Sequence, residues 1–151
     1  MQNYDPKVAA RVWERVQQPS PVAEEEAKLL PLIGQILCDA ATYQRLSRKL
    51  PPPQAAILRQ MATQLQTSAQ CLKGIYAMRT GSKATVSAAA AEEMPAAVLL
   101  RKCYGQEMGR LAHYEARKTD PQYGPVYHRL AEQTQSHCQK LLELFGTLNQ
   151  L

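Results

Sequence analysis

The chain is 151 residues long, has a formal net charge of +5, and is rich in Ala, Gln and Leu but poor in aromatic residues. This composition favours helices in a single domain, and no uncharged apolar run is long enough to span a membrane. The first residues lack the apolar segment of a signal peptide, so we expect a cytoplasmic protein with reduced cysteines. Because the basic residues are spread along the chain, we expect solvated helix faces and no nucleic-acid partner.

A short amphipathic helix is predicted first, over residues 5–17, between Asp5-Pro6 and Pro19-Ser20-Pro21. Residues 1–20 therefore form a predicted N-terminal helix and linker. Residues 21–151 form the main domain.

Four longer helices are predicted in residues 21–151. The first runs over 21–50, and Pro31 should kink it or mark its true start. The second follows the proline run 51–53 and ends near Gly81. After an alanine-rich connection over 81–94, the third covers 95–118 and the fourth continues to about Leu148. The order of short, long and short connections indicates two helical hairpins joined by one long crossover.

An internal repeat supports this arrangement. Ala41 and Tyr43 fall on Ala112 and Tyr114 when the sequence is shifted by about 70 residues. A second stretch repeats in the same way, with Ala62, Gln64, Gln66, Gln70 and Leu72 on Ala131, Gln133, Gln135, Gln139 and Leu141. Two copies of one hairpin predict a bundle with pseudo-twofold symmetry.

Heptad spacing predicts which residues face the centre of the bundle. Glu107 and His137 are the two strongly polar members of this set. The set comprises Leu29, Ile33, Ile36, Ala40, Tyr43, Leu58, Met61, Leu65, Ser68, Leu72, Ile75, Leu100, Tyr104, Glu107, Leu111, Tyr114, Tyr127, Leu130, Thr134, His137, Leu141, Leu144 and Leu148.

With this layout, residues 29–148 resemble the ferritin-like superfamily, and most of all rubrerythrin-related proteins without a rubredoxin domain. The resemblance implies an all-α, ferritin-like four-helix bundle, here with the extra N-terminal helix, and it implies a homodimer. In that family each half of the bundle supplies a Glu seven residues before a Tyr and a Glu-x-x-His on the partner helix. These side chains together hold two iron ions.

Most of these ligands are replaced in this chain. In the second half Glu107 lies seven residues before Tyr114 and His137 is present, but Thr134 occupies the matching Glu position. In the first half Ile36 occupies the Glu position, and the Glu-x-x-His has become Leu65-x-x-Ser68. Two divalent irons in a low-dielectric core need several carboxylates, and we expect only one inward carboxylate here. The resemblance therefore implies a degenerate di-iron site.

Two interpretations of Glu107 and His137 stay open. They form either a buried hydrogen-bonded pair that Tyr43 or Tyr114 joins, or a vestigial or weak metal site. In the second case a single zinc or iron ion would take a third ligand such as Cys103, one helical turn before Glu107. The four cysteines, Cys38, Cys71, Cys103 and Cys138, form no Cys-x-x-Cys pair and are expected to be small buried apolar residues.

The functional hypothesis that follows is a non-catalytic structural or interaction protein descended from a rubrerythrin-like bundle, with no cofactor expected. The alternative is a ferritin-like metal-binding oxidoreductase, a rubrerythrin-type peroxidase or oxidase with an atypical site. A weaker third hypothesis is nucleic-acid binding, which rests on the mild basic charge alone.

Overall fold

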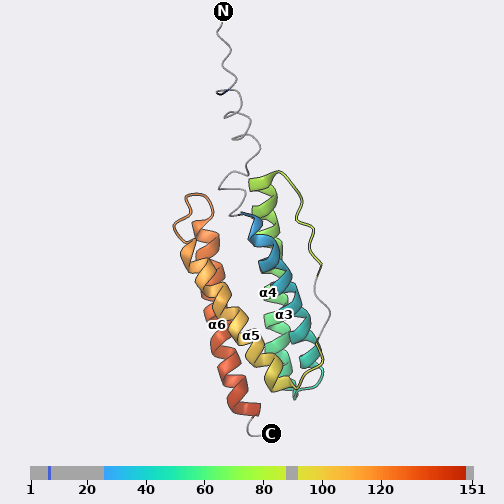
Figure 1. Cartoon of the computed structure of the whole chain (residues 1–151). Coiled ribbons are helices and arrows are strands. Elements are labelled where there is room, and N and C mark those ends of the chain that lie inside the picture. The colour runs from blue at the N-terminus through green and yellow to red at the C-terminus, as the bar shows by residue number, and fades with distance from the viewer. Residues whose placement is uncertain (1–6, 8–25, 88–91, 149–151) are drawn as a thin grey trace, which may run out of the picture.

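The computed structural model describes residue 7, residues 26–87 and residues 92–148. Four long helices lie in these ranges, labelled as in Figure 1: α3 (Leu29–Ser47), α4 (Pro52–Thr80), α5 (Ala96–Ala116) and α6 (Gly124–Leu148). The described residues contain no strand. The predicted all-α class and the four long helices are therefore confirmed. The predicted helix over residues 5–17 lies outside the described residues, apart from residue 7.

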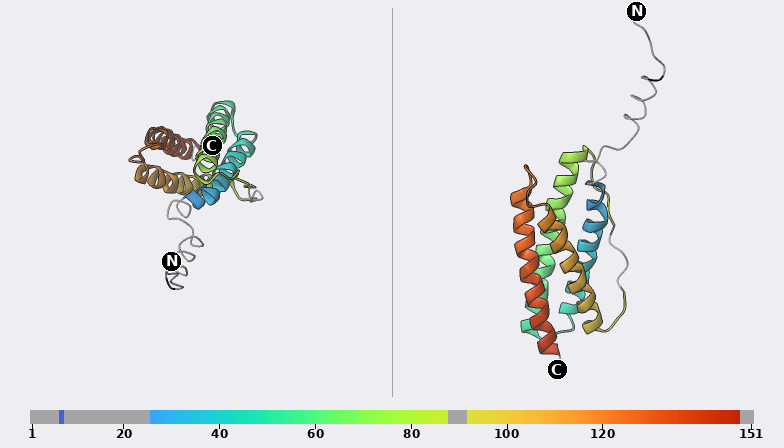
Figure 2. Two further views of the ribbon diagram at one scale, coloured as in Figure 1. Left: turned by 90° about the horizontal axis from the view of Figure 1, so that it is seen from above. Right: turned by 60° about the vertical axis from the view of Figure 1, so that its left-hand side comes forward.

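The four helices form a bundle of two antiparallel hairpins, α3–α4 and α5–α6 (Figures 1 and 2). Each helix packs along its hairpin partner and also meets one helix of the other hairpin, α3 with α5 and α4 with α6. The crossover between α4 and α5 is long and non-helical where it is described. Because it leads from one end of the bundle to the other, α4 and α5 run in the same direction (Figure 1).

Proline and glycine set the helix boundaries. Pro52 and Pro53 open α4, where their missing N–H groups would have no helical partner in any case. Gly81 ends the same helix in the left-handed conformation at φ 72°, and its N–H donates to the carbonyl of Ala77 at 2.9 Å. Pro31 lies in the first turn of α3, so it marks the start of that helix. At the start of α6, a Cβ on Gly124 would collide with the Lys118 carbonyl oxygen.

Predicted and observed cores agree on α3, on α4 and on all of α6 except Leu148, which is half-buried. The prediction for α5 is wrong at two positions. Tyr104 and Leu111 are half-buried, and the buried positions are instead Cys103 and Arg110, each one residue earlier. The helix is therefore rotated so that a guanidinium, and not a leucine, enters the centre of the bundle.

Among the described residues, none of the helices has the combination of length and apolar character that crossing a membrane requires.

Candidate functional site

Five polar side chains from all four helices meet at the centre of the bundle, and we call them the central network: Asp39, Gln64, Glu107, Arg110 and His137. Three of them, Glu107, Arg110 and His137, have exposed fractions of 0%, 1% and 0%, and Asp39 has 2%. Buried charges of this kind persist only when they are paired. The contacts within the network therefore decide what the centre can do.

Arg110 joins the two hairpins. Its Nη1 donates to Asp39 Oδ2 on α3 at 2.6 Å, and its Nη2 lies 2.9 Å from Glu107 Oε1, one turn away on α5. Nη1 also donates to Gln35 Oε1 at 3.0 Å. Burial lowers the pKa of the guanidinium, but the charges of Glu107 and Asp39 outweigh burial and raise that pKa above its usual value. Arg110 is therefore a permanent internal cation.

Glu107 accepts bonds from both halves of the bundle. Its Oε1 accepts the hydroxyl of Tyr43 at 3.2 Å and lies 3.2 Å from Nδ1 of His137. Burial raises the pKa of the carboxyl, but the bond to His137 and the charge of Arg110 outweigh burial, so the pKa is lowered. Glu107 is thus held as a carboxylate. Its second oxygen, Oε2, has no hydrogen-bond partner among the described residues.

His137 connects Glu107 to the opposite hairpin. Its Nε2 lies 2.7 Å from the Gln64 side-chain oxygen on α4. In the neutral tautomer with the proton on Nδ1, His137 donates to Glu107, and its Nε2 is an acceptor that needs a donor. The Gln64 side chain provides that donor if its amide is turned so that the nitrogen faces His137. An imidazolium would instead donate from both nitrogens. The repeat position of His137 in the first half is Ser68, whose hydroxyl accepts a bond from Gln133 at 2.6 Å.

Asp39 is the member of the network that borders a pocket. Besides Arg110, it accepts a long bond from the Cys103 thiol at 3.6 Å. When the amide of Gln106 is turned so that its nitrogen faces Asp39, that nitrogen donates to both carboxylate oxygens. Burial raises the pKa of Asp39 to about 6 in spite of Arg110. Burial and the neighbouring Asp39 also raise the pKa of Cys103 well above its ordinary value, so that thiol stays protonated.

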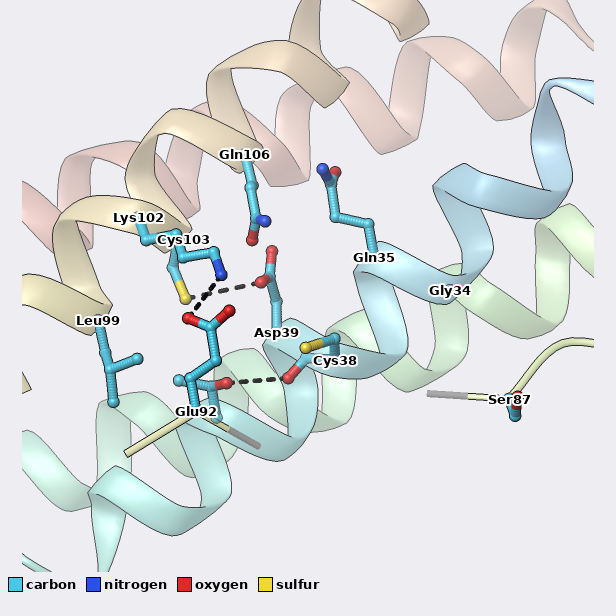
Figure 3. A pocket seen from close by; sticks show the side chains of 11 residues that line it. Gly34, Gln35, Cys38, Asp39, Ser87, Glu92, Leu99, Lys102, Cys103 and Gln106 are labelled. Atoms are coloured by element: carbon cyan, nitrogen blue, oxygen red, sulfur yellow. Dashed lines mark hydrogen bonds and ion pairs between the residues drawn. The ribbon is translucent and has the colours of Figure 1, made fainter. Parts of the chain in front are cut away.

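The pocket beside Asp39 has a volume of about 350 Å³ and lies between α3, α5 and the crossover (Figure 3). Lys102 and Glu92 form an ion pair at 2.8 Å among its lining residues. The full lining is Gly34, Gln35, Cys38, Asp39, Thr42, Ser87, Glu92, Leu99, Lys102, Cys103 and Gln106. The pocket therefore brings the solvent-accessible side of the bundle up to the central network.

The predicted polar pair is present, because Glu107 and His137 are in contact and Tyr43 joins them. Tyr114 instead packs its ring against His113 and Tyr127. The expectation of a single inward carboxylate is wrong, since Asp39 is buried as well. Asp39 lies one helical turn from both Ile36 and Tyr43, so its spacing in the sequence indicates that it shares their inward face.

The predicted burial of the cysteines holds for two of the four. Cys103 and Cys138 are buried, whereas Cys38 and Cys71 are half-buried, and all four thiols are free. Cys38 lines the pocket beside Asp39, and Cys71 lines a smaller one of about 200 Å³ between α4 and α6. These two thiols are wall residues of surface pockets, and the prediction is wrong for them.

The residues present do not fit the di-iron centre that the family resemblance implies. Glu107 is the sole carboxylate on a family ligand position, and the buried residues Ile36, Leu65 and Thr134 occupy three others. The Arg110 guanidinium already neutralises Glu107 at 2.9 Å, so a metal there would face a fixed cation. Among the described residues, no three His, Cys, Asp or Glu side chains are grouped so that they could hold a metal ion.

Comparison of the chain with protein-family models, with curated proteins and with solved structures finds no significant match in any of the three.

Proposed function

We propose that the chain is a ferritin-like, rubrerythrin-related bundle protein in which a buried ion network stands in place of a di-iron centre. In this proposal the protein is a non-catalytic structural or interaction protein. The observation that carries it is the position of Arg110, whose guanidinium lies within 2.9 Å of carboxylates on both hairpins.

The physical reason is charge compensation. A di-iron centre holds its carboxylates together through the positive charge of the metal ions, and the ligands must come from helices of both hairpins. Arg110 supplies a positive charge between Asp39 and Glu107 without any metal. A guanidinium also offers several donors in fixed geometry, which suits two carboxylates approaching from different helices.

An interaction role is supported by the uneven distribution of charge. Between residues 29 and 80 the chain carries six Lys and Arg side chains and one carboxylate, Asp39. That carboxylate is buried against Arg110, so it does not offset the exposed Arg48, Lys49 and Arg59 of the α3–α4 hairpin. A surface of one sign favours a partner with acidic groups.

The second candidate is the metal-binding oxidoreductase with an atypical site, and one observation favours it. Glu107 Oε2 is buried without a hydrogen-bond partner among the described residues, and His137 lies beside the other oxygen of the same carboxylate. Buried carboxylate oxygens are normally paired. A single metal ion bound to Oε2 would satisfy that oxygen.

Elemental analysis separates the two candidates. The protein is purified without chelator and analysed before and after anaerobic loading with Fe(II). We expect less than about a tenth of an equivalent of any transition metal, because Arg110 competes for the same carboxylate. One equivalent that is lost in both Glu107→Ala and His137→Ala would establish a mononuclear site. Two equivalents of iron would restore the di-iron enzyme and overturn the proposal.

The proposal includes a homodimer, and sedimentation of the full chain tests it. Met108 on α5 and Leu142 on α6 are large apolar side chains with exposed fractions of 43% and 54%, and Met108 contacts Cys138 one turn before Leu142. A dimer at tens of micromolar that Leu142→Lys dissociates would place the interface on this face. The matched control is Met78→Lys on α4, where the side chain is 75% exposed. A monomer at that concentration would contradict the dimer.

A further inference from the structure

The pocket between α3, α5 and the crossover has a charged floor and partly apolar walls (Figure 3). Asp39 forms its inner end, where the central network begins. Leu99 and the half-buried Cys38 contribute apolar wall. A volume of about 350 Å³ lies within the usual range of small-molecule sites.

The polar part of this lining includes a buried carboxylate and several acceptor oxygens. Asp39 accepts from Arg110, from the Cys103 thiol and, once its amide is turned, from Gln106, so it offers a ligand mainly its negative charge. Once its nitrogen donates to Asp39, the amide of Gln106 presents its oxygen. The hydroxyl hydrogen of Thr42 is used on the Cys38 carbonyl at 3.0 Å, which leaves its oxygen as an acceptor. The one charged donor in the lining, Lys102, is paired with Glu92 at 2.8 Å.

The charge balance of the buried groups also favours a positively charged ligand. Asp39 and Glu107 share the single guanidinium of Arg110, so this group of three carries an excess negative charge. Protonation of Asp39 can neutralise this charge from within, and a cation in the pocket can neutralise it from outside. Arg45 is not among the lining residues and does not neutralise this charge; its guanidinium donates to the backbone carbonyl of Glu92 at 2.7 Å. An uncompensated charge in a low-dielectric wall attracts a counter-ion strongly.

We propose that this pocket binds a small organic cation, namely a primary ammonium group on a compact apolar body, with the ammonium against Asp39. An ammonium carries a positive charge and three donors but no acceptor, which suits the negative charge of Asp39 and the free acceptor oxygens of Gln106 and Thr42. The apolar walls suit a carbon body more than a hydrated metal ion. A bare metal ion also lacks ligands here, since the described residues contain no group of three His, Cys, Asp or Glu side chains that could hold one.

The test uses the full chain and two probes of nearly equal shape, benzylammonium and benzyl alcohol, at matched ionic strength. Chemical-shift titration of the backbone amides reports both affinity and location. Benzylammonium is expected to bind in the millimolar range, as a fragment of this size allows, and at least about tenfold more tightly than benzyl alcohol. The shifts should centre on Gly34 and Cys38 of α3 and on Lys102 and Gln106 of α5.

Three variants test whether benzylammonium binds in this pocket. Asp39→Asn should reduce the affinity for benzylammonium at least about tenfold and leave benzyl alcohol unchanged. Cys38→Phe fills the pocket and leaves the ion pairs intact, so it decides the question even if Asp39→Asn does not fold. Cys71→Phe, at a half-buried cysteine of another pocket, is the matched control and should bind like the wild type.

Three results would overturn the proposal: equal affinity for the charged and neutral probes, unchanged binding in Cys38→Phe, or no shift with benzylammonium. The inference goes beyond the proposed function and does not depend on it. Metal content is measured separately, so a di-iron enzyme could still bind the amine, and a metal-free protein could fail to do so.

Discussion

Arg110 on α5 donates to Asp39 on α3 at 2.6 Å, with both side chains buried, and this ion pair ties the two hairpins together at the centre of the bundle. The pair removes two charges from water, so its net contribution to stability is smaller than its geometry suggests. Removal of one partner, however, leaves the other charge buried and uncompensated.

The first prediction concerns Arg110→Met. The change keeps most of the volume but leaves Asp39 and Glu107 without their shared cation, so it should lower the free energy of unfolding by about 3–5 kcal/mol. Urea denaturation followed by circular dichroism measures this. The control is Arg101→Met, an exposed position on the same helix, which should change stability by less than about 0.5 kcal/mol.

One outcome of the denaturation experiment would contradict this prediction. If Arg110→Met is as stable as the wild type, the two carboxylates are protonated or solvated in solution. The pairing of Arg110 with both hairpins would then not hold the centre together.

The second prediction concerns Glu107→Gln. The amide keeps the shape and still accepts the hydroxyl of Tyr43, and Arg110 keeps Asp39 as its partner. The fold should therefore stay intact, with stability shifted by about 1–3 kcal/mol. Glu132→Gln, in an exposed pair with His128, is the control and should have little effect. A Glu107→Gln variant as stable as the wild type would argue that Glu107 and His137 are not buried together.

The sequence predicts the bundle well because its signal is repeated many times. Each helix shows several apolar residues at heptad spacing, and prolines and glycines mark the boundaries at Pro52, Gly81 and Pro95. An error at one position is corrected by its neighbours, so the order and length of the helices follow from pattern alone. This redundancy is a property of extended hydrophobic faces.

The site is less predictable because it depends on a few charged residues. Periodicity on α5 allows either Leu111 or Arg110 to face inward, and hydrophobicity favours Leu111. The observed choice follows from Asp39 on another helix, 71 positions away in sequence, which pairs with Arg110. Sequence reasoning recovered Glu107 and His137 because the repeat and the family pattern marked them. Asp39, Arg110 and Gln64 were not predicted: the spacing of Asp39 marks it as an inward residue, whereas Arg110 and Gln64 are identified only by their long-range contacts.

The third prediction is a pH dependence that originates at Asp39. Its pKa is raised from 3.8 to about 6 in the folded protein, so the folded state holds this proton more tightly than the unfolded chain does. The resulting stabilisation is fully present below about pH 4 and is lost as the pH rises through about 6. From pH 7.5 to pH 5, the free energy of unfolding should therefore increase by about 1–3 kcal/mol.

Glu107 and Asp120 act in the opposite direction at lower pH. Burial raises the pKa of each, but bonds to their partners outweigh it, so both pKa values are lowered and the stabilisation they give is lost as the pH falls below about 4. Stability should therefore pass through a maximum at about pH 4. Thermal melts between pH 3 and 8 measure the profile, and Asp39→Asn should abolish the rise between pH 7.5 and 5. A rise that persists in this variant would assign it to another group.

The fourth prediction concerns a second link between the hairpins, at the end of the bundle where α4 finishes. Nη2 of Arg79 donates to both carboxylate oxygens of Asp120, which lies on the α5–α6 turn, at 2.8 Å each. The Arg79 guanidinium also lies 4.9 Å from the centre of the Tyr123 ring. Asp120 in turn accepts the backbone N–H groups of Gln122 and Tyr123, just before α6. Arg79 therefore connects the end of one hairpin to the turn of the other.

Arg79→Ala should lower the free energy of unfolding by about 1 kcal/mol, because Arg79 and Asp120 are each about one-fifth exposed and solvent screens the pair. Lys73→Ala, on the same helix and without an ion pair in the described residues, is the control and should be close to neutral. Hydrogen exchange distinguishes a local from a global effect. The amides of residues 118–124 should exchange faster in Arg79→Ala, whereas those around Glu107 should keep their protection. Equal acceleration at both places would mean that the bundle opens as one unit and that Arg79 does not act as a local tether.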